Sequence, residues 1–188
     1  MTKYIIPILL LFSFNSVAQN TLEWSKDYKL QKSDFLAKQQ GNGSTQKVLG
    51  SFYVTYEMGG FNLVTTRNLN KNVSCIFEKE ESYFDIDDDA AVKTMLRYQR
   101  LMFDLYEIQA RALRKTFFDE RGRLLTKGPG PLREKVANEH AKLIADVEEE
   151  TQYGHVSHQM NKWEQWTQNE LEKLSEFCKT CKPKKKKK

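Results

Sequence analysis

The apolar residues of this chain follow two different periods, one after the other. Between residues 48 and 58 they alternate with polar residues, which is the pattern of a strand. Between residues 85 and about 118 they recur at spacings of three and four, which is the pattern of one helix face. The positions in this second series, all apolar except Gln99, are Val92, Met95, Leu96, Gln99, Met102, Phe103, Tyr106, Ala110, Leu113 and Phe117. Strands followed by helices indicate an α+β domain.

Three strands are expected before residue 85. The first, at residues 48–58, ends at Gly59-Gly60, which is a tight-turn signal. A second strand is expected at residues 61–69, and a third at residues 73–78 after another turn. Adjacent strands joined by short turns predict an N-terminal antiparallel β-meander with one apolar face.

Three helices are expected after the strands. The first begins among the aspartates of residues 85–89, because a cap residue and negative charge satisfy the free amides and the dipole of a helix start. Pro131 can open the second helix, and residues 151–157 separate it from a third helix that ends near Phe177. With no linker and no internal repeat, residues 19–181 are predicted to form a single domain.

The start of the chain has the composition of a secretory signal. Lys3 provides a positive charge, an apolar stretch covers residues 4–14, and Ser16-Val17-Ala18 places small residues at a cleavage site. The apolar run is shorter than the roughly 20 residues that span a bilayer, and no second run follows it. We therefore expect a signal peptide at residues 1–18, no transmembrane anchor, and a secreted or periplasmic protein.

The formal net charge of +5 is concentrated at one end of the chain. Lys182 and residues 184–188 supply six positive charges and Lys3 a seventh, so the remaining residues carry about −2. A lysine run is typically a solvated terminus, although several lysines together also attract anionic lipid or polyanions. The body of the protein gives no indication of nucleic-acid binding, and residues 182–188 are interpreted as a lysine-rich tail.

The three cysteines are Cys75, Cys178 and Cys181. In an exported protein they meet oxidising conditions, so one disulfide is expected with one cysteine left over. The spacing of Cys178 and Cys181 also occurs in redox and metal motifs, but here no second cysteine pair and no βαβ unit accompanies it. A structural disulfide is the favoured interpretation, and the sequence leaves its pairing open.

Several separated segments resemble one known family. They are Trp24 with residues 28–30 and 33–35, Phe103-Asp104, residues 110–114, residues 150–154, and Gln159 with Trp163. In this order and spacing they are similar to the predicted secreted zinc-dependent proteases of the DUF922 type, zincin-like proteins common in Bacteroidetes-type bacteria. The resemblance covers nearly all of the mature chain, and it implies a zincin-like fold and a zinc-dependent peptidase ancestry.

The residues that this family uses for zinc and water are replaced in this chain. The resemblance puts the two histidines of a His-Glu-x-x-His motif at Tyr98 and Met102, the catalytic glutamate at Gln99, and a further histidine at Tyr153. A tyrosine binds metals well only as phenolate and has a pKa of about 10, a thioether is a poor zinc ligand, and an amide cannot act as a general base. We therefore expect a degenerate site with no catalytic residues and no zinc, although zinc is the family's cofactor.

Other chemistry has weaker support. His155 and His158 lie three apart, and with the glutamates of residues 148–150 they could form a relocated metal site. His140, in contrast, is interpreted as an ordinary surface residue. The sequence contains no Gly-x-Ser-x-Gly motif and no phosphate-binding glycine loop. Trp24, Trp163 and Trp166 could form a platform for a sugar or a peptide, but such tryptophans more often attach a helix to a sheet.

These observations give three hypotheses. The leading one is an exported non-catalytic protein that binds a peptide or another envelope protein in a degenerate zincin-like cleft, with Tyr98, Met102 and Tyr153 on its floor. The alternative is an active metal-dependent hydrolase that uses His155 and His158. The third is a surface-adhesion protein that acts through its lysine tail. The sequence does not specify the oligomeric state.

Overall fold

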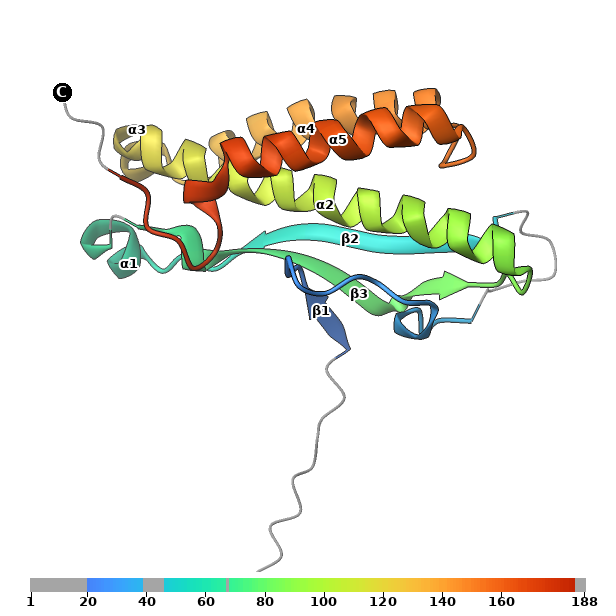
Figure 1. Ribbon diagram of the computed structural model, residues 1–188. Coiled ribbons are helices and arrows are strands. Elements are labelled where there is room, and N and C mark those ends of the chain that lie inside the picture. The colour runs from blue at the N-terminus through green and yellow to red at the C-terminus, as the bar shows by residue number, and fades with distance from the viewer. Residues whose placement is uncertain (1–19, 39–45, 67, 185–188) are drawn as a thin grey trace, which may run out of the picture.

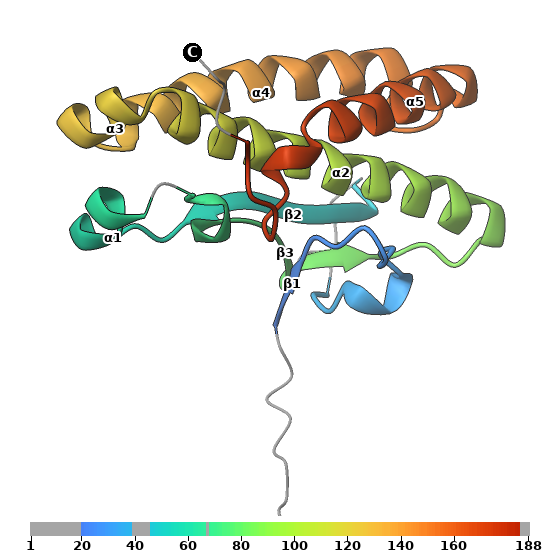
Figure 2. The same cartoon turned by 60° about the vertical axis from the view of Figure 1, so that its left-hand side comes forward.

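A single long helix forms the middle layer of the molecule. This helix, α2 (Asp89–Asp119), contacts strands β2 (Val48–Tyr56) and β3 (Val73–Phe84) on one side, and helices α4 (Gly130–Thr151) and α5 (Ser157–Lys173) on the other (Figures 1 and 2). The structure is a computed structural model that describes residues 20–38, 46–66 and 68–184. The described part is an α+β arrangement of sheet, central helix and helix pair, as the change of period predicts.

The sheet differs from the expected meander. Within the described residues it has three antiparallel strands in the order β1-β3-β2, where β1 (Thr21–Glu23) is a short strand that the sequence analysis missed. The expected strand at residues 61–69 is wrong, because α1 (Gly60–Thr65) begins there. The guanidinium of Arg121 donates to the carbonyls of Leu63, Val64 and Thr66. Carbonyls at the end of a helix need such partners, and here a side chain supplies them.

Strand β3 is longer than expected and contains an irregularity. It continues to Phe84, beyond the predicted end at residue 78, and its pairing with β2 shifts between Leu49 and Ser51. The hydroxyl of Ser82 is fully buried in this irregularity, where it accepts from the amide of Ser51 at 2.9 Å and donates to the carbonyl of Glu78 at 2.6 Å. The interruption therefore leaves these polar groups hydrogen-bonded.

The predicted helices are present, with two short additions. Asp88 caps α2 by accepting from the amide of Ala91 at 2.8 Å, and Pro131 stands in the first turn of α4. Helix α5 is followed by a short 3-10 turn, η3 (Ser175–Phe177). The additions α1 and α3 (Arg121–Lys127) give five α-helices in the described residues, where three were expected. Two further 3-10 turns are η1 (Lys32–Asp34) and η2 (Asn70–Asn72).

Two hydrophobic clusters share α2 between them. One packs the sheet face, including Val73 and Phe77, against Phe103 and Phe117 of α2. The other packs the opposite side of α2 against α4 and α5 through residues such as Met160. Each cluster includes side chains of α2, so this helix covers the apolar face of the sheet on one side and that of the α4–α5 pair on the other.

A buried ion cluster joins the layers. The Oε1 atom of Glu107 accepts from Arg111 Nε at 2.9 Å and from Arg114 Nη1 at 2.8 Å. Arg114 also donates to the carbonyls of Val73 in β3 and Phe177 in η3. One side chain of α2 therefore contacts both the sheet and the C-terminal turn.

The cysteine pairing is local. Cys178 and Cys181 form a disulfide, and Cys75 is a free, buried thiol. Burial raises the pKa of the Cys75 thiol well above its ordinary value.

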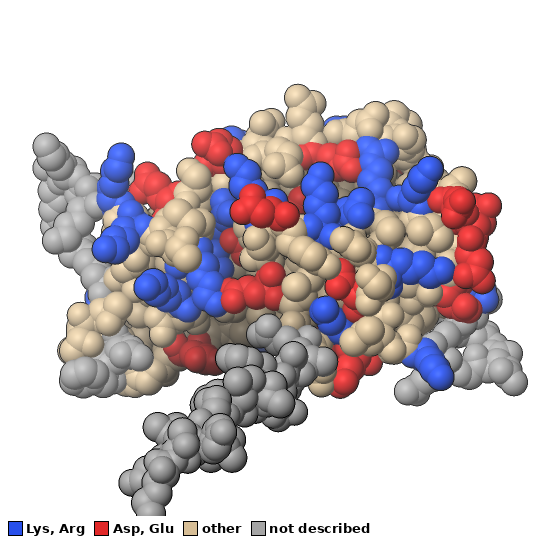
Figure 3. Space-filling model, turned by 60° about the horizontal axis from the view of Figure 1, so that its bottom comes forward, with Lys and Arg blue, Asp and Glu red and all other residues tan. Residues whose placement is uncertain are grey.

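The predicted signal peptide at residues 1–18 and most of the lysine tail, residues 185–188, lie outside the described residues. Among the described helices, none is both long and apolar enough to cross a bilayer. On the face shown in Figure 3, basic and acidic side chains are intermingled.

Candidate functional site

The positions assigned to the degenerate zinc site lie together in a groove. This groove, with a volume of about 870 Å³, is bounded by the start of β2, one face of α2 and the end of α4 with the turn after it. Its wall includes Tyr98, Gln99, Met102, Tyr153 and His155. The structure therefore brings together the four positions that the resemblance aligns with zinc-site residues, three from one helix turn and one from a segment about fifty residues later.

The turn between α4 and α5 is packed tightly onto α2. Gln152 and Tyr153 adopt positive φ angles of 47° and 55°, and Gly154 follows at 93°. A Cβ atom on Gly154 would lie 2.6 Å from the Cβ of Tyr98, so only glycine allows this approach. The ring of Tyr153 stands edge-on to the ring of Tyr98 at a centroid distance of 6.5 Å. The backbone conformation of this turn is therefore what brings Tyr153 to the groove.

The two tyrosines have different environments. Tyr98 is buried, and burial together with nearby Glu148 raises the pKa of its phenol. Tyr153 is 60% exposed. Burial also raises the pKa of the Tyr106 phenol on the same wall, and that of the Glu148 carboxyl. The inner part of the groove is thus an apolar, weakly hydrated surface that disfavours charge.

Gln99 presents an unsatisfied acceptor inside the groove. Its side chain is only 6% exposed, and its Oε1 atom has no hydrogen-bond partner among the described residues. It lies against Gly50 of β2, where a Cβ atom would overlap it. Gly50 stands at the shift in the β2–β3 pairing. An orphaned buried carbonyl is costly, so this enclosed oxygen lowers the stability of the folded protein.

These residues do not fit a zinc ion. The raised pKa of Tyr98 keeps its phenol neutral, Met102 offers only a soft thioether, and Gln99 cannot accept a proton from water. His155 is exposed on the groove rim, whereas His158 is exposed on α5 and does not line the groove. Among the described residues, no group of three or more His, Cys, Asp or Glu side chains is placed to hold a metal.

The interpretation of His140 as a surface residue is wrong. Its imidazole is 7% exposed, stands edge-on to the ring of Tyr106 at 4.7 Å, and has no hydrogen-bond partner for either nitrogen in the described residues. Burial lowers its pKa from 6.5 to about 4. The polar neighbours of His140 in the sequence suggested exposure, but the residue occupies the side of α4 that faces α2.

The three tryptophans do not share one surface. Trp163 and Trp166 contact each other at 5.4 Å between centroids, in the helix pair. Trp24 begins the N-terminal segment, residues 24–30, which follows β1. Its Nε1 donates to Asp104 at 2.7 Å, and its ring lies under the guanidinium of Arg111. Trp24 therefore attaches the segment that follows β1 to α2.

Comparison with known proteins adds no relative. No protein-family model matches the chain, and searches of curated proteins and of solved structures give no match either.

Proposed function

We propose that this protein is exported and acts without catalysis, by binding a peptide segment or another envelope protein in the groove between β2, α2 and the α4–α5 turn. One observation carries the proposal: Tyr98, Gln99, Met102 and Tyr153 converge on one groove, yet none of them supplies a zinc ligand or a general base. A zincin-like ancestry accounts for both facts, because the scaffold is kept while the reactive groups are replaced.

Two features of the groove suit an extended peptide. First, β2 has β3 as its one sheet neighbour among the described residues, so its other edge has backbone groups available for an added strand. Second, the apolar side chains of Met95, Met102 and Tyr106 line the groove and can bury apolar side chains of a ligand.

The binding half of the proposal is tested with a displayed library of random short peptides. We expect enrichment of apolar sequences on the purified mature protein and at least about tenfold weaker binding by Tyr153→Asn, because exposed aromatic residues dominate many interfaces. Asparagine tolerates the positive φ of this position, so the turn is retained. Leu125→Asn, which changes an exposed apolar residue on α3, is the matched control.

Two results would contradict this half. One is no peptide enriched above background. The other is a set of peptides that binds wild-type protein and Tyr153→Asn equally well.

The non-catalytic half is tested by elemental analysis after zinc exposure and buffer exchange, together with a peptidase assay on casein. We expect far less than one zinc per chain and no cleavage. Close to one zinc per chain, lost when His155 and His158 are both changed to alanine, would overturn the proposal and support a relocated metal site. Zinc that survives this double change would overturn it as well.

A further inference from the structure

A second cavity lies on the opposite face of α2 from the groove. It has a volume of about 540 Å³ and is bounded by residues 24–30, α2 and α5. Arg97, Arg100, Asp104 and Arg111 of α2 line it, whereas the groove uses Met95, Tyr98, Gln99, Met102 and Tyr106. With about 3.6 residues per turn, these two sets project from opposite sides of the helix. The cavity is therefore a separate site.

Two opposite charges in this cavity stand at ion-pair spacing without pairing. Arg100 and Asp104 are four residues apart on α2, a spacing at which such side chains usually meet. Instead, Arg100 Nε donates to the carbonyl of Leu30 at 2.9 Å, and Asp104 Oδ1 accepts from Trp24 Nε1 at 2.7 Å. Both partners belong to the N-terminal segment, which thus holds the two charged groups apart.

Arg100 and Asp104 each have polar atoms left to bind a ligand. The two terminal nitrogens of Arg100 have no hydrogen-bond partner among the described residues. The second carboxylate oxygen of Asp104 has only a long contact, 3.4 Å from Gln168 Nε2. Arg97, by comparison, donates to Glu164 from Nε and Nη2 and to Asn161 from Nη2. Free donors and a free acceptor therefore face one cavity.

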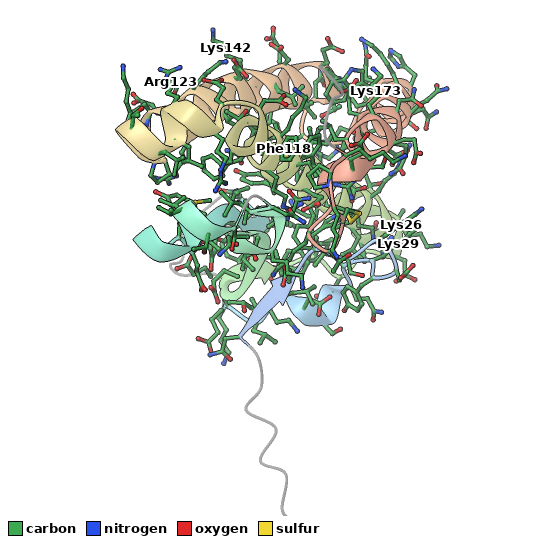
Figure 4. The ribbon with its side chains drawn as sticks, turned by 90° about the vertical axis from the view of Figure 1, so that its left-hand side faces the viewer. Lys26, Lys29, Phe118, Arg123, Lys142 and Lys173 are labelled. Carbon is green, nitrogen blue, oxygen red and sulfur yellow. A yellow bond between two sulfur atoms is a disulfide. The ribbon has the colours of Figure 1, made fainter. Side chains whose placement is uncertain are left out.

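The rim adds positive charge and the walls add apolar surface. Lys26 and Lys29 are exposed, make no ion pair with any described residue, and lie at the same edge of the molecule (Figure 4). Lys29 is near enough to Asp104 to act on its carboxylate electrostatically. The apolar part of the lining includes Trp24, Leu101 and Leu171.

We propose that this cavity binds a small zwitterion of the α-amino-acid class. Arg100, assisted by Lys29, takes the carboxylate, Asp104 takes the ammonium group, and the ligand's apolar side chain packs on Trp24 and Leu171. A simple anion would leave the carboxylate of Asp104 facing negative charge, and a simple cation would face Arg100 and the lysines. A zwitterion satisfies both groups at once, and charge-assisted hydrogen bonds of this kind are the strong ones.

The experiment is calorimetric titration of the mature protein with three probes: L-leucine, N-acetyl-L-leucine and L-leucinamide. We expect L-leucine to bind and each of the other two to bind about 10- to 100-fold more weakly, because each lacks one charged partner. Asp104→Asn should weaken L-leucine binding by a similar factor and leave N-acetyl-L-leucine binding unchanged. Arg100→Gln should weaken L-leucine binding and leave L-leucinamide binding unchanged.

Two further variants guard against a folding artefact. Lys29→Gln changes an exposed side chain that no described residue binds, and it should weaken L-leucine binding about two- to fivefold. Tyr153→Asn, in the groove, should leave it unchanged, which separates this site from the proposed function. The proposal is overturned if wild-type protein does not bind L-leucine, if N-acetyl-L-leucine binds equally well, or if Lys29→Gln has no effect.

Discussion

His140 is the residue that departs most from the behaviour its sequence neighbourhood indicates. It is enclosed between α2 and α4 as a neutral ring, with a pKa lowered to about 4 by burial. Unfolded histidine binds a proton below about 6.5, so the unfolded state binds more protons than the folded state between these values. The contribution of His140 to the free energy of unfolding is therefore fully present above pH 6.5, and it is lost as the pH drops towards 4.

This prediction is measured by urea unfolding at several pH values. The His140 contribution should destabilise the protein by up to roughly 3 kcal/mol across that window, at about 1.4 kcal/mol per pH unit. His140→Phe keeps a ring against Tyr106 and cannot be protonated, so its pH dependence should be shallower by that amount. His158→Gln, on the exposed surface of α5, should follow the wild-type curve. Parallel curves for wild type and His140→Phe would contradict the prediction.

Two glycines offer a contrast at the same scale. Gly154→Ala should destabilise the protein by about 2 kcal/mol or more, because it combines a positive φ of 93° with overlap on Tyr98. Gly122→Ala on α3 meets no neighbour and should stabilise by about 0.5 to 1 kcal/mol. Thermal unfolding of both variants tests the pair. Equal effects would show that the α4–α5 turn is not constrained as described.

At the scale of elements, the period of the apolar residues predicts the long helices correctly but does not predict the short segments. Helix α2 was predicted because its stripe covers many turns. The strand expected at residues 61–69 was wrong because a short apolar run fits either conformation, and Arg121 from a distant helix satisfies the helical carbonyls. Strand β1 has three residues, too few to show any alternation.

The candidate sites show the same limit. Tyr98 and Met102 share a helix face by spacing alone, and only the family resemblance linked them to Tyr153. In the cavity beside α5, Asp104 is held away from Arg100 by its hydrogen bond with Trp24, a residue 80 positions away in the chain. No local pattern encodes such a contact, because it forms only when the N-terminal segment packs on α2.

The turn at residues 176–181 is fixed by hydrogen bonds from η2 as well as by the disulfide between Cys178 and Cys181. The buried amide of Asn70, in η2, donates to the carbonyls of Glu176, Cys178 and Cys181 at 3.1 to 3.2 Å. Asn70→Ala leaves these carbonyls without that donor, so trypsin should cleave after Lys179 at least several-fold faster than in wild type. Asn72→Ala, which removes an exposed amide bonded to Glu57, is the control. Equal cleavage rates would show that the disulfide suffices.

At the scale of the whole molecule, α2 makes the layers depend on one another. Both hydrophobic clusters include its side chains, and the Glu107 cluster connects it to β3 and η3. Glu107 compensates two guanidinium groups in a buried position. Its loss should therefore affect the sheet and the helix pair together rather than one of them.

Glu107→Gln tests this dependence. The amide keeps the size of the carboxyl group but leaves two buried positive charges uncompensated, which should cost about 3 to 5 kcal/mol. Urea unfolding should show circular dichroism and tryptophan fluorescence shifting together to a lower midpoint with an unchanged slope, because the tryptophans lie on α5 and against α2. Lys115→Ala, which breaks the exposed pair with Asp119, should cost no more than about 0.5 kcal/mol. Separate transitions for the two signals would contradict the prediction, because they would mean that the molecule does not unfold as one unit.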